Sequence, residues 1–406
     1  MKKILILLLT LLIISGCDAK KAIQPSFDNE TDSSSQSQVY DYLNQSLDSF
    51  IFSNTELPKF NNQVVDWNVV SGDAIIENNI ISKTDNADEY EMIVLEATVN
   101  DESYLFDNLE LMDSRAAYVM SYFGGDDEDN YQNAKLAYTY NGLLWYLVNN
   151  DEPIVRAELG SKQIRDPYIV RKKNGTFSMI ATQGWNNSSI YVWDSDDLCT
   201  YNNERLLQVN KSSSDQKMSE KQAWAPEAFY DRIIDKYVIY WSSPEDGGMY
   251  YNLTSDFNDI SYPKQLLDTG FTVIDGTIVK IGYDYTIILK DEREPMEEYS
   301  SLFVGTSSTN YLGFDTFSEN RITGHQSEGP FVMKGDVDYI VFYDDYTRKQ
   351  FQAMTTKDIR SEEFEELNML TDVVAPMISP RHASVIPVTW NELVKIIKEY
   401  KTEDIE

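Results

Sequence analysis

From residue 117 onward, short apolar runs rich in Val, Ile, Tyr and Phe follow one another at the length and spacing typical of β-strands. Five of these runs are preceded directly by a single polar residue, at intervals of 61, 48, 53 and 54 residues. The five are Asp166, Glu227, Asp275, Glu328 and His382. A period of about 50 residues indicates a repeated structural unit, so each polar residue is predicted to begin one unit.

Each unit predicts four strands. A second, aromatic-rich strand follows the first, and a third strand ends in a hydroxyl-rich motif whose short side chains can bond the backbone of a turn. These turn motifs begin at Ser195, Thr254, Thr306 and Thr356. A weaker fourth strand completes the unit, and four antiparallel strands at this period are typical of a propeller blade.

The fifth unit has only its first strand, because the chain after residues 382–388 turns into WNELVKIIKEY, a predicted terminal helix. The missing strands are predicted at the other end of the repeats, in residues 117–160. Pairing the two ends closes the last blade and leaves a ring without open sheet edges. We therefore predict a five-bladed β-propeller with a C-terminal helix over residues 114–406.

Residues 47–113 contain alternating strand-like segments separated by Asn, Asp and Gly, which predicts a small β-sandwich domain. The stretch LPKFNNQVVDWNVVSGDAIIENNIIS resembles the immunoglobulin-like modules found beside bacterial extracellular glycosidases. The expected fold class is thus all-β, a five-bladed β-propeller preceded by a small immunoglobulin-like β-sandwich.

The N-terminus has the anatomy of a signal peptide. Two lysines precede an apolar run, residues 4–14, that is too short to span a bilayer. Ile14-Ser15-Gly16-Cys17 resembles a bacterial lipoprotein cleavage box, in which Cys17 becomes the lipid-modified first residue. We predict a signal peptide over residues 1–16, a flexible tether over 17–46, and an extracytoplasmic protein anchored to a bacterial membrane.

Composition and charge narrow the partners. The formal net charge is −33, which repels phosphate backbones, so nucleic acid is a poor partner and a neutral ligand fits better. The chain has two histidines, which argues against Ser–His–Asp catalysis and His-rich zinc sites. With Cys17 lipidated, Cys199 has no partner for a disulfide and is expected to be buried. We expect a monomer.

The first strands of propeller blades line the central axis, so the five polar residues are predicted to ring one pocket. Four of them are carboxylic acids. One must stay ionised to activate water, and another must be protonated at the working pH, which like-charge crowding favours. Glycoside hydrolysis needs such a pair of carboxyl groups.

The residues around these positions resemble glycoside hydrolase family 43 over about residues 116–390. The matching motifs are Arg165-Asp166-Pro167, Trp224-Ala225-Pro226-Glu227, Ile274-Asp275-Gly276, Glu328-Gly329-Pro330 and Arg381-His382-Ala383-Ser384. Members of that family are five-bladed propellers, mostly inverting, that act on arabinofuranosides, xylosides and some galactans. The order and blade spacing of the five motifs make the resemblance specific.

The resemblance implies a role for each residue. Asp166 is the general base that activates water, Asp275 tunes and orients the acid, and Glu328 is the general acid that protonates the leaving oxygen. Glu227 is assigned to substrate binding or to the structure of the pocket. His382 helps hold an axial metal ion, often calcium, largely through water, although no cofactor is required.

Further side chains are candidates for substrate binding. Trp185 and Trp224 are placed to stack on sugar faces. Arg165 and Arg381 flank the acids and can hold carboxylates ionised or bond sugar hydroxyls, and Lys290 can act in the same way.

The function expected is an inverting glycosidase that cleaves neutral oligo- or polysaccharides, an α-L-arabinofuranosidase first and a β-xylosidase second. One alternative is a retaining propeller hydrolase of the fructan type, which also uses an Arg-Asp-Pro motif. Another is a non-catalytic, glycan-binding lipoprotein.

Overall fold

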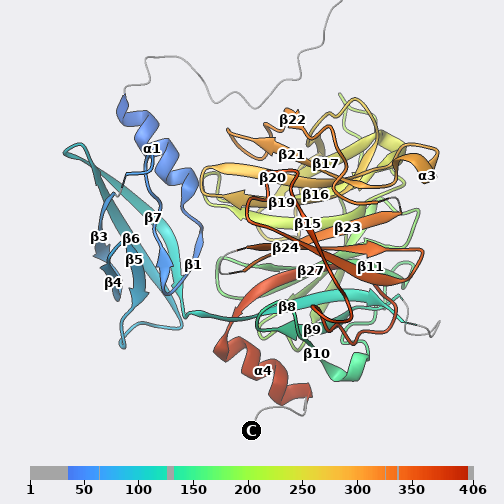
Figure 1. The fold of residues 1–406 in the computed structure, drawn as a ribbon, viewed down its shortest axis with the longest axis horizontal. Coiled ribbons are helices and arrows are strands. Elements are labelled where there is room, and N and C mark those ends of the chain that lie inside the picture. The colour runs from blue at the N-terminus through green and yellow to red at the C-terminus, as the bar shows by residue number, and fades with distance from the viewer. Residues whose placement is uncertain (1–34, 64, 126–131, 325, 336–337, 401–406) are drawn as a thin grey trace, which may run out of the picture.

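The computed structural model describes residues 35–63, 65–125, 132–324, 326–335 and 338–400. Regular structure in these residues is almost entirely β-sheet, which confirms the all-β prediction (Figure 1). The predicted signal peptide, the predicted lipidation site Cys17 and residues 17–34 of the predicted tether lie outside the described residues. Within the described ranges, no helix combines the length and apolar character needed to cross a membrane.

Two small sheets come first in the chain and lie beside the larger body (blue and teal in Figure 1). Their strands are β1 (Phe50–Phe52), β2 (Thr55–Glu56), β3 (Asp66–Ser71), β4 (Ala74–Glu77), β5 (Ile80–Lys83), β6 (Tyr90–Val99) and β7 (Glu102–Met112). The strand orders are β1-β7-β6-β3 and β2-β5-β4. Trp67, Leu95 and Phe106 are buried in one hydrophobic core with side chains from both sheets.

The prediction of a flexible tether is wrong for residues 35–46. They form helix α1 (Ser35–Ser46), and Leu43 is fully buried in the core of the two small sheets. Val39 and Leu43 are four residues apart, which places them on one face of α1, and Leu47 follows directly after the end of the helix. The sequence did not predict this helix, because its apolar face consists of few residues in an otherwise polar segment.

Four larger sheets follow, each built from four consecutive antiparallel strands. The first contains β11 (Ile164–Arg171), β12 (Phe177–Gln183), β13 (Ser189–Ser195) and β14 (Asn202–Gln208). The second contains β15 (Trp224–Asp231), β16 (Lys236–Ser243), β17 (Gly248–Thr254) and β18 (Lys264–Gln265). The third contains β19 (Val273–Ile281), β20 (Asp284–Asp291), β21 (Leu302–Ser307) and β22 (Thr316–Phe317), with the short helix α3 (Met296–Tyr299) before β21. The fourth contains β23 (Ser327–Lys334), β24 (Tyr339–Asp345), β25 (Gln350–Thr356) and β26 (Glu365–Leu367).

The fifth large sheet joins the two ends of the repeat region, as predicted. Its strands are β8 (Arg115–Gly124), β9 (Lys135–Thr139), β10 (Trp145–Leu147) and β27 (Pro380–Thr389). Their order is β10-β9-β8-β27, and β27 runs antiparallel to β8. The chain then forms the predicted terminal helix, α4 (Trp390–Tyr400).

The first strand of each repeat contacts the next one around a ring. β11 contacts β15, β15 contacts β19, β19 contacts β23, β23 contacts β27, and β27 contacts β11. We call these five strands the ring strands. All five polar residues that mark the repeat lie on them, so the ring brings together residues that are far apart in sequence.

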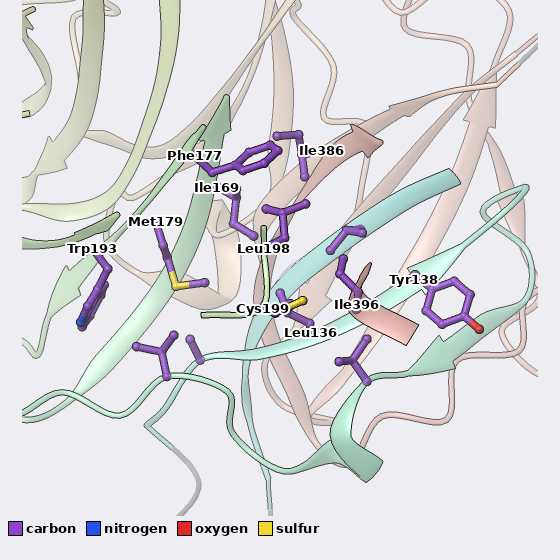
Figure 2. Close-up of a cluster of buried hydrophobic side chains, with 14 of the residues drawn as sticks. Leu136, Tyr138, Ile169, Phe177, Met179, Trp193, Leu198, Cys199, Ile386 and Ile396 are labelled. Carbon is purple, nitrogen blue, oxygen red and sulfur yellow. The ribbon is translucent and has the colours of Figure 1, made fainter. Parts of the chain in front are cut away.

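A hydrophobic cluster holds the first and fifth large sheets together (Figure 2). Ile169 of β11 and Phe177 of β12 lie near Ile386 of β27, and Ile396 of α4 belongs to the same cluster. Cys199 is a free, buried cysteine there, which agrees with the expectation of a small apolar side chain. The two chain ends are therefore joined by core packing as well as by strand pairing.

The hydroxyl-rich motifs close turns as predicted. The backbone N–H of Leu198 donates to Ser195 Oγ at 2.9 Å, directly after β13. In the third large sheet the closing residue is Ser307 rather than Thr306, and it accepts from the N–H of Thr309 at 3.3 Å. The motif therefore marks the end of the third strand, with a shift of one residue in that repeat.

A buried ion pair connects α4, the ring and the small sheets. Arg171 of β11 pairs with Glu392 of α4, and their side chains are only 5% and 2% exposed. Glu392 also accepts from the Tyr90 hydroxyl of β6 at 2.7 Å and from the Thr389 N–H at 2.8 Å. Burial alone would raise the pKa of Glu392, but Arg171 outweighs burial and lowers it.

We predict that Glu392→Ala lowers the free energy of unfolding by about 3–5 kcal/mol, because the Arg171 guanidinium is left buried without its partner. The pKa of Glu392 is lower in the folded than in the unfolded state. Its contribution is therefore present above the unfolded pKa and is lost as the pH falls through the folded pKa. Urea denaturation measures the difference between variant and wild type, which should shrink between about pH 7 and about pH 3.

Glu399→Ala, at an exposed position of the same helix, is the matched control and should change stability by less than about 0.5 kcal/mol. Equal losses for the two variants would show that the ion pair does not stabilise the fold.

Candidate active site

Every ring strand carries a β-bulge at the same level. The register to the neighbouring strand shifts between Arg165 and Tyr168 in β11, and at matching places in the other four ring strands. One residue in each bulge has a left-handed backbone. These residues are Asp166, Ala225, Asp275, Gly329 and His382, with φ of 48°, 44°, 53°, 56° and 24°. Bulges bend a strand and re-aim its side chains, so a shared bulge directs five strands toward one site.

Three of the bulge residues bring their side chains into contact. His382 Nδ1 lies 3.5 Å from Asp166 Oδ1 and 3.7 Å from Asp275 Oδ2. The Gly329 N–H donates to Asp275 Oδ2 at 3.2 Å. A Cβ atom at position 329 would lie 2.8 Å from the His382 ring. The backbone of Gly329 is also left-handed, so only glycine fits at this position.

Glu328 stands one residue before the bulge of β23 and is held by two cations. Lys290 Nζ lies 3.0 Å from Glu328 Oε2, and Arg381 Nη2 donates to Glu328 Oε1 at 2.5 Å. The Glu328 side chain is 19% exposed, compared with 10% for Asp166 and 7% for Asp275. Of these three carboxyl groups, Glu328 is thus the most accessible to a ligand.

The surroundings give these groups different affinities for a proton. Burial raises the pKa of Asp275 to about 6, although His382 opposes the effect. Burial alone would raise the pKa of Glu328 as well, but Lys290 and Arg381 lower it below its usual value. Burial alone would lower the pKa of His382, but Asp166 and Asp275 raise it. The imidazolium form of His382 is therefore favoured between two carboxylates.

Glu227 differs from the other marked residues. It lies after the bulge of β15, at the register position of Thr277 in β19 and Ser384 in β27. All three line a cavity of about 1040 Å³ between the ring and the small sheets. Glu227 is 5% exposed, accepts from the Tyr240 hydroxyl, and has its pKa raised to about 7 by burial. The sequence treated it as equivalent to Asp166 because both precede an apolar run.

The predicted aromatic and arginine residues form a stack beside Asp166. The Arg165 guanidinium lies 4.1 Å from the centre of the Trp185 ring and 4.7 Å from that of Phe123. Trp224 meets Trp185 edge to face at 5.5 Å, and its Nε1–H donates to the Trp185 carbonyl at 2.7 Å. Trp185 is 51% exposed, which leaves a large aromatic side chain in contact with solvent.

Three residues that the sequence analysis missed connect neighbouring sheets at the bulges. Thr182 Oγ1 accepts from the Ala225 N–H at 2.7 Å, and Ser242 Oγ accepts from the Asp275 N–H at 3.0 Å. Asp344 Oδ2 accepts from the His382 N–H at 3.4 Å. Each of the three lies on the second strand of its sheet, in register with the residue before the bulge of the first strand. Lys290 has the same position in the third large sheet. A polar residue at this repeated position of the second strands was therefore a signal that the sequence offered.

The residues around His382 do not fit the expected calcium site. Calcium takes about six to eight oxygen ligands, and the raised pKa of His382 favours the imidazolium form, which does not ligate a metal ion. Nδ1 of His382 instead faces two carboxylates. In the part of the chain that the structure describes, no group of three or more His, Cys, Asp or Glu side chains is arranged to hold a metal ion.

Carboxyl groups of unequal proton affinity, together with an exposed tryptophan, are typical of enzymes that hydrolyse glycosidic bonds. A family model described as a probable glycosyl hydrolase domain, related to glycoside hydrolase family 43, matches residues 113–393. The chain belongs to this family. The prediction of a family-43-like glycosidase is thus confirmed at the level of the family.

Individual relatives are distant. An α-L-arabinofuranosidase of Bifidobacterium longum subsp. longum is 24% identical over 180 residues, which are 36% of this chain and only 16% of that protein. The GH43 BlXynB protein from Bacillus licheniformis is 14% identical, with a TM-score of 0.45, over 68% of this chain and 56% of its own. A family-43 β-xylosidase/α-arabinofuranosidase from a compost metagenome is 14% identical, with a TM-score of 0.42, over 53% and 79%.

We predict that His382 titrates above the usual imidazole pKa of about 6.5 and that Asp166→Asn lowers its pKa, because the variant removes one of the two facing negative charges. Proton–nitrogen NMR of the ring measures this. The chain has two histidines, so a His325→Asn background leaves a single imidazole signal.

Asp196→Asn, at an exposed turn of the first large sheet, is the matched control and should leave the titration of His382 in place. A pKa of His382 that does not respond to Asp166→Asn would show that the two side chains do not interact as described.

Proposed function

We propose that this protein is an inverting glycoside hydrolase acting on neutral glycans, with α-L-arabinofuranosidase the preferred activity and β-xylosidase the next. The observation that carries the proposal is the meeting of Asp166, Asp275 and Glu328 around His382 at the bulges of the ring. The proposal needs no cofactor.

The proposed roles are those that the family resemblance implies, and the three groups have different surroundings. Asp166, whose Oδ1 lies 3.5 Å from His382 Nδ1, takes the proton of the attacking water as general base. Glu328, the most exposed of the three, protonates the leaving oxygen, although Lys290 and Arg381 hold its pKa below its usual value. Asp275 is almost fully buried and acts on the neighbouring groups through its charge. A bound sugar would exclude water and strengthen these effects.

A second proposal concerns the architecture of the five large sheets and the two small ones. We propose that the five large sheets are blades of a five-bladed propeller, and that the two small sheets form an immunoglobulin-like sandwich. The circular contacts among the ring strands and the closure of the fifth sheet by both chain ends support the first proposal. The two sheets on one core support the second.

The proposal of a neutral glycan as substrate is supported by the net charge of the chain and by the exposed Trp185 ring. A chain with net charge −33 disfavours anionic glycans, and Trp185 offers an exposed ring for stacking on a neutral sugar. The α-L-arabinofuranosidase relative supports the choice of sugar. We also propose that Cys17 is lipidated, which would anchor a monomeric, extracytoplasmic enzyme to a bacterial membrane.

We predict that Asp166→Asn and Glu328→Gln each lower kcat on a polymeric or oligomeric arabinoside or xyloside by about 10²- to 10⁴-fold, because each removes one proton transfer. Screening arabinan, arabinoxylan, xylan and galactan identifies the substrate. Proton NMR of the first product anomer then shows inversion.

Asp196→Asn and Glu366→Gln, at exposed positions of the same sheets as Asp166 and Glu328, are the matched controls and should retain activity. Retained activity in Asp166→Asn or Glu328→Gln would remove the assignment. A product of retained configuration would favour a fructan-type enzyme, and binding without turnover would favour a glycan-binding lipoprotein.

A further inference from the structure

A fully buried carboxylate that the proposed mechanism does not use lies directly behind Glu328. Asp344 of β24 and Glu328 of β23 are cross-strand partners in register. Asp344 is 0% exposed, so it does not meet substrate. Like charges opposite one another destabilise a strand pair unless a cation lies between them.

Arg381 of β27 is that cation, and it donates to both carboxylates. Its Nη2 donates to Glu328 Oε1 at 2.5 Å, and its Nε donates to Asp344 Oδ2. Lys290 behaves similarly, since its Nζ lies 3.0 Å from Glu328 Oε2 and 2.8 Å from Glu292 Oε2. Each cation that binds Glu328 thus also binds a second carboxylate.

Because Lys290 and Arg381 are shared, the cluster of five charged side chains around Glu328 is not electrically balanced. Glu328, Asp344 and Glu292 each carry one negative charge when ionised, and Lys290 and Arg381 each carry one positive charge. One negative charge is left over. A buried site with an uncompensated negative charge favours the uptake of a proton.

Three further charged groups lie beside the cluster, His382, Asp275 and Asp166. His382 contacts Asp344 through its backbone N–H, and its imidazolium offsets the carboxylate of Asp275, which also acts on Glu328. Because His382 also faces Asp166 at 3.5 Å, these three groups together add one more negative charge beside the cluster, and Asp344 adds to it.

We propose that Asp344 is a positioning residue that holds part of Arg381 away from Glu328, so that Glu328 remains able to take up and donate a proton. Without the charge of Asp344 one negative charge fewer faces Arg381, and more of the guanidinium can turn toward Glu328. A two-pronged ion pair stabilises the carboxylate form at the expense of the acid form. The inference rests on the proposed role of Glu328 and deepens it.

The test compares two substrates that carry the same sugar and differ in their leaving group. An oligosaccharide needs protonation of the leaving oxygen, whereas a 2,4-dinitrophenyl glycoside releases a stable phenolate without it. Asp344→Asn should lower kcat/KM on the oligosaccharide by about 10²-fold and change the dinitrophenyl reaction little. Asp344→Glu restores the charge and should recover part of the loss.

Asp345→Asn is the matched control, because Asp345 is the next residue and bonds a surface turn through Thr347 and Arg348. It should leave both reactions unchanged. Circular dichroism checks folding, and Asp344→Ser provides the same comparison if the Asn variant does not fold.

Equal losses of Asp344→Asn on both substrates would show a structural role and overturn the proposal, as would no loss on either. Failure of the wild-type protein to hydrolyse either substrate would instead overturn the proposed function and this inference with it. The wild-type measurement therefore distinguishes the two failures.

Discussion

A left-handed residue sits in a β-bulge at the same level of each of the five ring strands. Each such residue other than glycine costs roughly 1–2 kcal/mol, so the bulges persist only because the surrounding sheets hold them. Thr182, Ser242 and Asp344 do so across the sheet boundaries by accepting the backbone N–H of the next bulge. The strained backbone of the bulges and the placement of the side chains that they carry therefore depend on the same contacts between sheets.

The bulges also bring like charges together, and the cations around them decide what each carboxyl group can do. His382 lies between Asp166 and Asp275, while Lys290 and Arg381 hold Glu328. Removing any one partner changes the proton affinity of the others, because buried charges are weakly screened. An isolated sequence motif does not carry this information, since the partners come from different sheets.

The period of the polar residues predicted the five sheets, their strand order and the closure of the fifth by both chain ends. It did not show that Glu227 stands beyond the bulge whereas Asp166 lies within it, because a shift of two residues around a bulge is invisible in an apolar run. Asp344 was missed because it stands at the end of an apolar second strand, where a polar residue looks like a turn. Helix α1 was missed because its short apolar face lies in a polar segment.

The central claim is that Asp166 and Glu328 flank one glycosidic bond. The most direct test is a crystal structure of Glu328→Gln with a bound oligosaccharide from the substrate screen. The account predicts a glycosidic oxygen within hydrogen-bond reach of residue 328. It also predicts a water between Asp166 and the anomeric carbon, with the two carboxyl positions about 6.5–9.5 Å apart. A sugar bound away from the ring bulges, or a separation of about 5–5.5 Å without room for that water, would contradict it.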